Sequence, residues 1–275
     1  MHPITRQLHH NITQKGSYVC EGLDPDIKAL PIHLPRSIDG VNSFLNTIIE
    51  NTADLAIAYK ANISFFESMG LEGLKLLSTL RNVIPRSIPL IIDGKRGDIG
   101  NTSRHQAAFL FDHMGADAST VNPYMGIDAL SPFFDYKDKL HFVLVLTSNP
   151  GAADFERLTL STGKTLSEAV LAKCTEWQRQ FGNLGCVVGA TQSELPQLRS
   201  QDQSLPYLIP GVGAQGGSYT DAVRDGINQN GVVIVNVGRS ILYASAESNF
   251  GSAAKAALQL TVQLPKGPVQ QVIPA

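Results

Sequence analysis

The stretch IPLIIDGKRGDIGNTS, residues 88–103, changes character partway along. Its first five residues are apolar or proline, and four charged residues then follow within six positions: Asp93, Lys95, Arg96 and Asp98. A nearly continuous apolar run of this kind is typical of a parallel strand that is buried on both faces. The stretch therefore predicts a parallel α/β fold with charged residues, separated by glycines, at the carboxyl end of a strand.

The same pattern recurs along the chain. With residues 88–93, the candidate strands are 17–24, 55–62, 117–122, 141–147, 184–190, 206–210 and 231–238. Each is followed by a helical or potentially helical stretch; after the first strand, for example, apolar residues from Val41 to Ile49 recur on one helix face, with Asp39 as the expected N-cap. Eight such units in roughly 250 residues predict a (β/α)8 TIM barrel. A doubly wound open sheet is the alternative.

No linker or shift in composition divides the chain, so we expect one domain over residues 1–275. Within it, residues 1–16 are expected to form an N-terminal helical extension. Residues 264–275 are rich in proline and are expected to form an irregular C-terminal tail.

The composition limits the class of protein. Of the 275 residues, 43% are hydrophobic, which is enough for one large core, and the net charge is −2 with both signs mixed along the chain. We therefore expect no nucleic-acid or membrane partner. The first 20 residues lack a signal-peptide core, and Cys20, Cys174 and Cys186 form no CxxC pair, so we expect a cytoplasmic protein with reduced thiols. The seven histidines show no metal-ligand spacing, and no metal site is expected.

Polar residues stand at the ends of most candidate strands. They are Asp24, Lys60, Asp93, Lys95, Asn122, Ser148 and Arg239. Because the active site of a (β/α)8 barrel lies at the carboxyl ends of its strands, we expect these residues to converge on one mouth. Asp24 or Asn122 alone would be interpreted as a turn or capping residue. Lys60 interrupts an apolar strand, so it must be buried and paired or face a polar cavity.

A glycine-rich loop, PGVGAQGG, follows the seventh strand at residues 210–217. Gly211, Gly213 and Gly216 satisfy the GxGxxG pattern, and with Arg239 after the next strand they outline an NADP-binding unit. Too little chain follows for a full dinucleotide fold. In a barrel, the loops after strands seven and eight bind phosphate through backbone N–H groups, and an arginine adds matched donors. We favour phosphate over a dinucleotide.

Lys95 stands between two carboxylates, Asp93 and Asp98, in the sequence. Each carboxylate favours the charged ammonium, which is a poor nucleophile. Such a lysine is a good proton donor and stabilises negative charge that develops on carbon. The structural alternative is a surface ion-pair ladder that caps a helix near Thr102.

In this order and spacing, DGKRGDIGNTS, PGVGAQGG and VGRSI resemble the orotidine 5′-phosphate decarboxylase family, in the form of its longer bacterial subgroup. CEGLDPD, YKANISFFE and TSNP fit the family's first, second and fifth strand ends, so the resemblance runs from about residue 17 to 245. Ser218 is a departure, because the family more often has an acidic residue there. The resemblance therefore does not predict how the helix after Ser218 begins.

The resemblance implies decarboxylation of orotidine 5′-phosphate to UMP and CO2, the last step of pyrimidine nucleotide synthesis, without metal or cofactor. It also implies a homodimer with shared active sites. Lys95 would protonate C6 of the pyrimidine beside Asp93, while Asp98 and Thr102 would reach into the partner's site. The implied substrate contacts are Asp24 and Lys60 to ribose, Ser148 to the base, Gln215 between base and phosphate, and Gly216, Gly217 and Arg239 to phosphate.

Two other functions remain open. Magnesium-dependent sugar-phosphate decarboxylases and hexulose-phosphate synthases share the DxKxxD core, although Ser148 and the glycine-rich loop favour a nucleotide substrate. A non-catalytic nucleotide-binding protein would keep Arg239 but would not need a charged Lys95.

Overall fold

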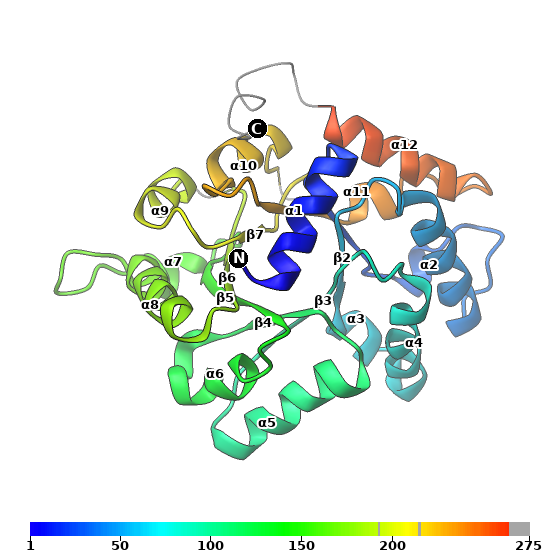
Figure 1. Cartoon of the computed structure of the whole chain (residues 1–275). Helices are drawn as coiled ribbons and strands as arrows, with labels where there is room; N and C mark the ends of the chain where they lie inside the picture. The colour runs from blue at the N-terminus through cyan, green and yellow to red at the C-terminus, as the bar shows by residue number, and fades with distance from the viewer. Residues whose placement is uncertain (192, 214–215, 264–275) are drawn as a thin grey trace.

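The strands form a closed, all-parallel barrel in the computed structural model, which describes residues 1–191, 193–213 and 216–263 (Figure 1). Each strand pairs with the next, and β8 closes the barrel against β1. The strands are β1 (Val19–Gly22), β2 (Ala58–Asn62), β3 (Leu90–Arg96), β4 (Ala118–Val121), β5 (Leu140–Leu146), β6 (Leu184–Val188), β7 (Tyr207–Ile209) and β8 (Ile234–Val237). The predicted (β/α)8 barrel is confirmed, and the open sheet is excluded.

Each predicted strand is present, and β3 differs most from its predicted range. It continues to Arg96, three residues beyond the predicted end at Asp93. The pairing of β3 with β4 shifts register between Ile92 and Arg96, which marks a bulge. Bulges are common next to active sites, where they change the direction in which a side chain points. The charged residues of the opening stretch therefore begin inside the irregular last part of a strand rather than after it.

The helices surround the barrel (Figure 1). They are α1 (Pro3–Lys15), α2 (Ile38–Thr52), α3 (Ile63–Glu67), α4 (Gly70–Val83), α5 (Gly100–Ala108), α6 (Ile127–Phe134), α7 (Ala152–Phe155), α8 (Leu166–Phe181), α9 (Leu195–Gln201), α10 (Tyr219–Gly226), α11 (Arg239–Leu242) and α12 (Phe250–Val262). Short helical segments are η1 (Ile27–Ala29), η2 (Phe109–His113) and η3 (Pro123–Met125).

The predicted N-cap at Asp39 is wrong. Helix α2 begins at Ile38, and Ser37 caps it by accepting a hydrogen bond from the Gly40 N–H. Asp39 instead lies in the first turn, where its charge suits the positive end of the helix dipole. Helix α8 ends at Phe181, and Gly182 caps it in the left-handed conformation that glycine adopts readily.

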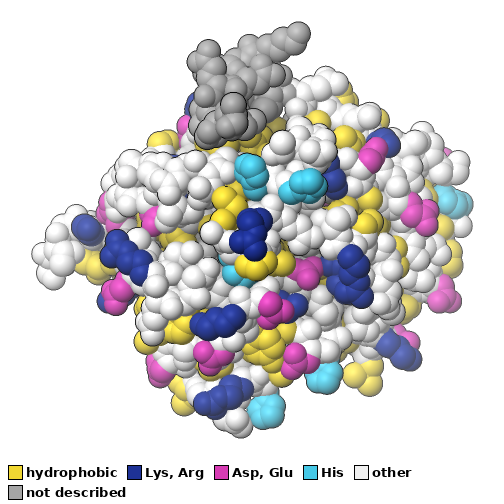
Figure 2. Space-filling view, viewed as in Figure 1, with side chains coloured by type: hydrophobic (Ala, Val, Ile, Leu, Met, Phe, Trp, Pro, Cys, Tyr) yellow, Lys and Arg dark blue, Asp and Glu magenta, His cyan; other side chains and the backbone are white. Residues whose placement is uncertain are grey.

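Helix α1 covers the amino ends of the strands. Asn11 donates to the carbonyls of Ile57 and Ser87, which precede β2 and β3, and Leu8 and Ile12 are buried in the core. In Figure 1 this helix lies across the barrel, and Figure 2 shows acidic and basic side chains interspersed over the same face. The opposite, carboxyl end is left for a binding site. The predicted tail, residues 264–275, lies outside the described residues.

Candidate active site

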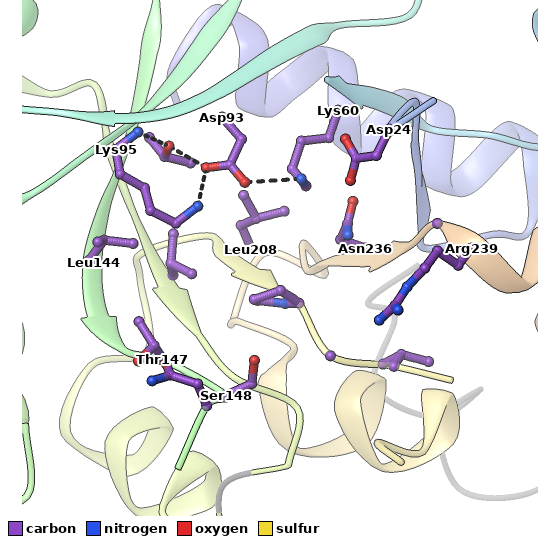
Figure 3. Close-up of a pocket in the computed structure, with 17 residues that line it drawn as sticks. Asp24, Lys60, Asp93, Lys95, Leu144, Thr147, Ser148, Leu208, Asn236 and Arg239 are labelled. Carbon is purple, nitrogen blue, oxygen red and sulfur yellow. Dashed lines mark hydrogen bonds and ion pairs between the residues drawn. The ribbon is translucent and has the colours of Figure 1, made fainter. Parts of the chain in front are cut away.

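A cavity of about 320 Å³ opens at the carboxyl ends of the strands. All eight strands, or the loops directly after them, contribute to its lining. Asp24, Lys60, Asp93 and Lys95 lie along one wall, Thr147 and Ser148 lie on the opposite side, and Arg239 stands at one end (Figure 3). Leu144 and Leu208 contribute apolar surface. The cavity is therefore a mixed polar and apolar site of the kind that binds small polar molecules.

Asp93 is the centre of a hydrogen-bonded array in this cavity. Its Oδ2 accepts from Lys60 Nζ at 3.1 Å. Its Oδ1 accepts from Lys95 Nζ at 2.7 Å and from the Thr120 hydroxyl at 2.8 Å (Figure 3). Both carboxylate oxygens are thus occupied, and one carboxylate holds two ammonium groups in place.

The array is charged at neutral pH. Burial alone would raise the pKa of Asp93, but Lys60 and Lys95 more than offset it and hold that pKa well below its ordinary value. Burial would likewise lower the pKa of Lys60, but Asp93 and then Asp24 reverse the effect and raise it. The array thus carries two positive charges and one negative charge, with a second carboxylate nearby at Asp24.

The two lysines differ in access. Both lysines line the cavity, but the side chain of Lys60 is 5% exposed, whereas that of Lys95 is 45% exposed. Lys60 is therefore the more deeply buried cation of the two, and Lys95 is the more accessible one. A charged donor held in place before the reaction stabilises developing negative charge without a reorganisation cost.

The backbone at Lys95 is unusual. Its φ of 46° is the one positive value at a non-glycine residue within the described ranges. A long side chain rarely adopts this conformation, which costs on the order of 1–3 kcal/mol and is found mainly at functional sites. The Lys95 N–H donates to the Thr120 hydroxyl at 3.0 Å.

Asp24 and Ser148 also line the cavity. Asp24 accepts a hydrogen bond from the Asn62 N–H at 2.9 Å, which fixes its carboxylate at the end of β2. Ser148 follows Thr147, whose N–H donates to Glu156 at 2.6 Å. This hydrogen bond therefore anchors the start of the loop after β5 to Glu156, which directly follows α7.

Arg239 lines the cavity at the start of α11, and the glycine-rich loop lies beside it. Gly211 borders the cavity, but Gly216 and Gly217 do not. Their N–H groups donate to the carbonyls of Gly213 and Gly211, at 2.8 and 3.1 Å. Both amides are thus bonded within the loop itself, and the predicted residue Gln215 lies outside the described residues.

Ser218 caps the helix that follows this loop. Its hydroxyl accepts from the Asp221 N–H at 3.2 Å, and α10 begins at Tyr219. Serine is a preferred N-cap residue, so the departure from the family's acidic residue leaves the start of the helix intact.

Asp98 and Thr102 do not line the cavity of their own chain. Asp98 Oδ1 accepts from the Ile99 N–H at 2.8 Å, and Thr102 is exposed in the first turn of α5. Among the described residues, Asp93 is the one carboxylate that pairs with Lys95. The two carboxylates that flank Lys95 in the sequence therefore do not both pair with its ammonium within one chain, and no ion-pair ladder caps α5 among the residues that the structure describes.

Four polar residues that line the cavity were not predicted: Thr120, Thr147, Asn149 and Asn236. Thr120 and Asn236 lie within strands, and the direction of each side chain depends on the strand register. Asn236 lines the cavity, and its Oδ1 is buried with no hydrogen-bond partner in the part of the chain that the structure describes. Such groups are rare, so Asn236 is a further candidate for contact with a bound molecule.

The described ranges contain no group of three or more His, Cys, Asp and Glu side chains that could hold a metal ion. Over the same ranges, no helix has the length and apolarity needed to cross a membrane.

Comparison with known proteins identifies the family. A family model described as "Orotidine 5'-phosphate decarboxylase / HUMPS family" matches residues 17–255. The chain belongs to this family. The chain is 43% identical over 254 residues to a protein of Thermomicrobium roseum named orotidine 5′-phosphate decarboxylase, covering 91% of this chain and 90% of that one.

Solved structures of the family agree with the barrel. A putative orotidine-monophosphate-decarboxylase from Toxoplasma gondii has a TM-score of 0.87 at 32% identity, covering 97% of both chains. The OMP decarboxylase of Leishmania donovani has a TM-score of 0.81 at 32% identity, covering 95% of this chain and 99% of that one.

Proposed function

We propose that this chain decarboxylates orotidine 5′-phosphate to UMP and CO2 in pyrimidine synthesis, with Lys95 as the catalytic acid. The relatives that cover about nine-tenths of the chain carry this activity in their names. The observation that carries the assignment is the Lys60–Asp93–Lys95 array, which faces the same cavity as Arg239. A fixed cation on one side and an arginine on the other suit a substrate with a reacting carboxylate and a distant phosphate.

The chemistry requires a cation close to carbon. Loss of CO2 from C6 leaves an electron pair that the pyrimidine ring delocalises poorly. Lys95 stabilises this charge because Asp93 already holds its ammonium in position. The ammonium then transfers a proton to C6, giving UMP and a neutral amine, which regains a proton from solvent.

The remaining residues bind the substrate. Arg239 holds the phosphate through its planar fork of donors. Asp24 and Lys60 bind the ribose hydroxyls, since both lie at the cavity wall next to Asp93, and Ser148 contacts the base. The phosphate is also bound by Gln215 and by the backbone N–H groups of Gly216 and Gly217. For the two glycines, the loop must exchange its internal hydrogen bonds for bonds to phosphate.

The active unit is a homodimer in which Asp98 and Thr102 complete the partner's site. Their position outside their own cavity supports this arrangement. Exposed apolar side chains also lie on the loops after β3 and β4, which approach each other closely at Gly97 and Asn122. They are Ile99, Tyr124 and Met125. A solvent-exposed apolar group of this kind suits a subunit interface.

The protein acts in the cytoplasm. Its three cysteines are free and buried, as expected of a chain that works in a reducing compartment.

An absorbance assay tests the proposal. The purified chain, treated with EDTA, should consume orotidine 5′-phosphate and form an equal amount of UMP. Activity that disappears with EDTA and returns with Mg²⁺ would instead favour the sugar-phosphate enzymes. Binding of UMP without turnover of orotidine 5′-phosphate would favour a non-catalytic nucleotide-binding protein.

A further inference from the structure

Thr120 lies in β4, opposite the irregular end of β3, and is 1% exposed. Its hydroxyl donates to Asp93 Oδ1 at 2.8 Å and accepts from the Lys95 backbone N–H at 3.0 Å. A hydroxyl has one proton to donate, and a carboxylate can only accept. The direction of both hydrogen bonds is therefore fixed, and the hydroxyl joins the side chain of one site residue to the backbone of another.

The first bond orients the carboxylate of Asp93. Oδ1 receives the Thr120 hydroxyl and the Lys95 ammonium, while Oδ2 receives Lys60. Rotation of the carboxylate would break all three charge-assisted bonds at once. Without the hydroxyl, the two flexible lysine side chains would be left to orient Asp93.

The second bond supports the strained backbone of Lys95. The β3–β4 pairing is interrupted between Ile92 and Arg96, so this N–H lies where the regular ladder is broken. This partly buried N–H still needs an acceptor, and Thr120 supplies it. The hydroxyl thus stabilises a φ of 46° that a lysine would otherwise avoid.

We propose that Thr120 is a positioning residue for the decarboxylation, acting through Asp93 and Lys95. This inference rests on the proposed function. The hydroxyl holds the Lys95 backbone and the carboxylate that binds the Lys95 ammonium, so it sets where the ammonium meets the reacting carbon. Small displacements of a catalytic group lower the rate of the chemical step more than they lower substrate binding.

The test compares Thr120→Val, which removes the hydroxyl and keeps the branched shape, with Thr120→Ser, which keeps the hydroxyl. We expect T120V to lower kcat by on the order of 10- to 100-fold. The dissociation constant for UMP should change by less than about 3-fold, because Thr120 acts on the reacting centre. T120S should retain kcat within about 3-fold of the wild type.

Ser119→Ala is the matched control. Ser119 is the preceding residue of β4, is also buried, and bonds His141 at 3.1 Å rather than a cavity residue. Loss of this hydroxyl should leave kcat unchanged. Should T120V fail to fold, Thr120→Ala provides the same loss of the hydroxyl with a smaller side chain.

Three results would overturn the inference: wild-type kcat in T120V, an equal loss of kcat in T120S, or a loss of UMP affinity in T120V that matches the loss of kcat. The last would make Thr120 a substrate-binding residue. An inactive wild-type chain would refute the proposed function itself, whereas an active wild type with an unchanged T120V would refute only the role of Thr120.

Discussion

Glu21 is a buried carboxylic acid that the proposed chemistry does not use, and replacing it with glutamine should stabilise the protein at alkaline pH. It lies in β1 beside Tyr59 of β2, is 0% exposed, and neither of its carboxyl oxygens has a hydrogen-bond partner among the described residues. Burial raises the pKa of Glu21 from 4.5 to about 8. The nearby Thr52 hydroxyl lowers this pKa by less than burial raises it.

The size and sign of the effect follow from these pKa values. The unfolded chain releases the Glu21 proton near pH 4.5, whereas the folded chain keeps it until about pH 8. Between these values the folded state binds one more proton, so the free energy of unfolding falls as the pH rises through this window. At about 1.4 kcal/mol for each pKa unit, the full gap corresponds to about 5 kcal/mol. Since water and relaxation lower the cost of a buried charge, we expect a measured loss of about 2–5 kcal/mol.

Urea unfolding of the wild type and Glu21→Gln at pH 5 and pH 8.5, at equal protein concentration, measures this loss. The stability of E21Q relative to the wild type should increase by about 2–5 kcal/mol between the two pH values, because glutamine does not titrate. Glu72→Gln is the control, since Glu72 is exposed on α4 and should show no such change. Equal pH dependence in the wild type and E21Q would refute the reasoning.

Two further predictions concern binding and assembly. Arg239→Ala should weaken UMP binding by roughly 10- to 100-fold and leave uridine binding nearly unchanged, since a charged hydrogen bond contributes about 1.5–3 kcal/mol; equal losses in two titrations would contradict the phosphate role. The variants should each be nearly inactive alone when the change is Lys60→Ala or Asp98→Ala. When the two chains are co-expressed in equal amounts, about half of the dimers are mixed, and each mixed dimer has one intact site of two. Roughly a quarter of wild-type activity should therefore return. Verified mixed dimers as inactive as their parents would place Asp98 within its own subunit.

The apolar runs were sufficient to predict the barrel. A run such as residues 231–238 is too short for a membrane span and too β-branched for a surface helix, and eight such runs leave few alternatives. The boundaries were less predictable. The charges at Asp93 and Lys95 suggest that β3 has ended, whereas the bulge lets the strand continue through them.

Some polar residues of the site could likewise be predicted from the sequence, and others could not. Asp24, Lys60 and Arg239 could be found because a charge at an apolar strand end is unusual. Thr120 and Asn236 could not, because threonine is common in strands and one asparagine in VVIVNVG gives no direction. Their contribution depends on strand register and on the closure of the barrel, neither of which local patterns specify.

Lys95→Ala tests the central claim most directly. The measurement pairs turnover of orotidine 5′-phosphate with the dissociation constant for UMP, in the wild type and in the variant. Because Lys95 is assigned both charge stabilisation and proton transfer, kcat should fall by at least about 10³-fold, while UMP binding should persist. Turnover by K95A comparable to the wild type would contradict the assignment of Lys95 as the catalytic acid.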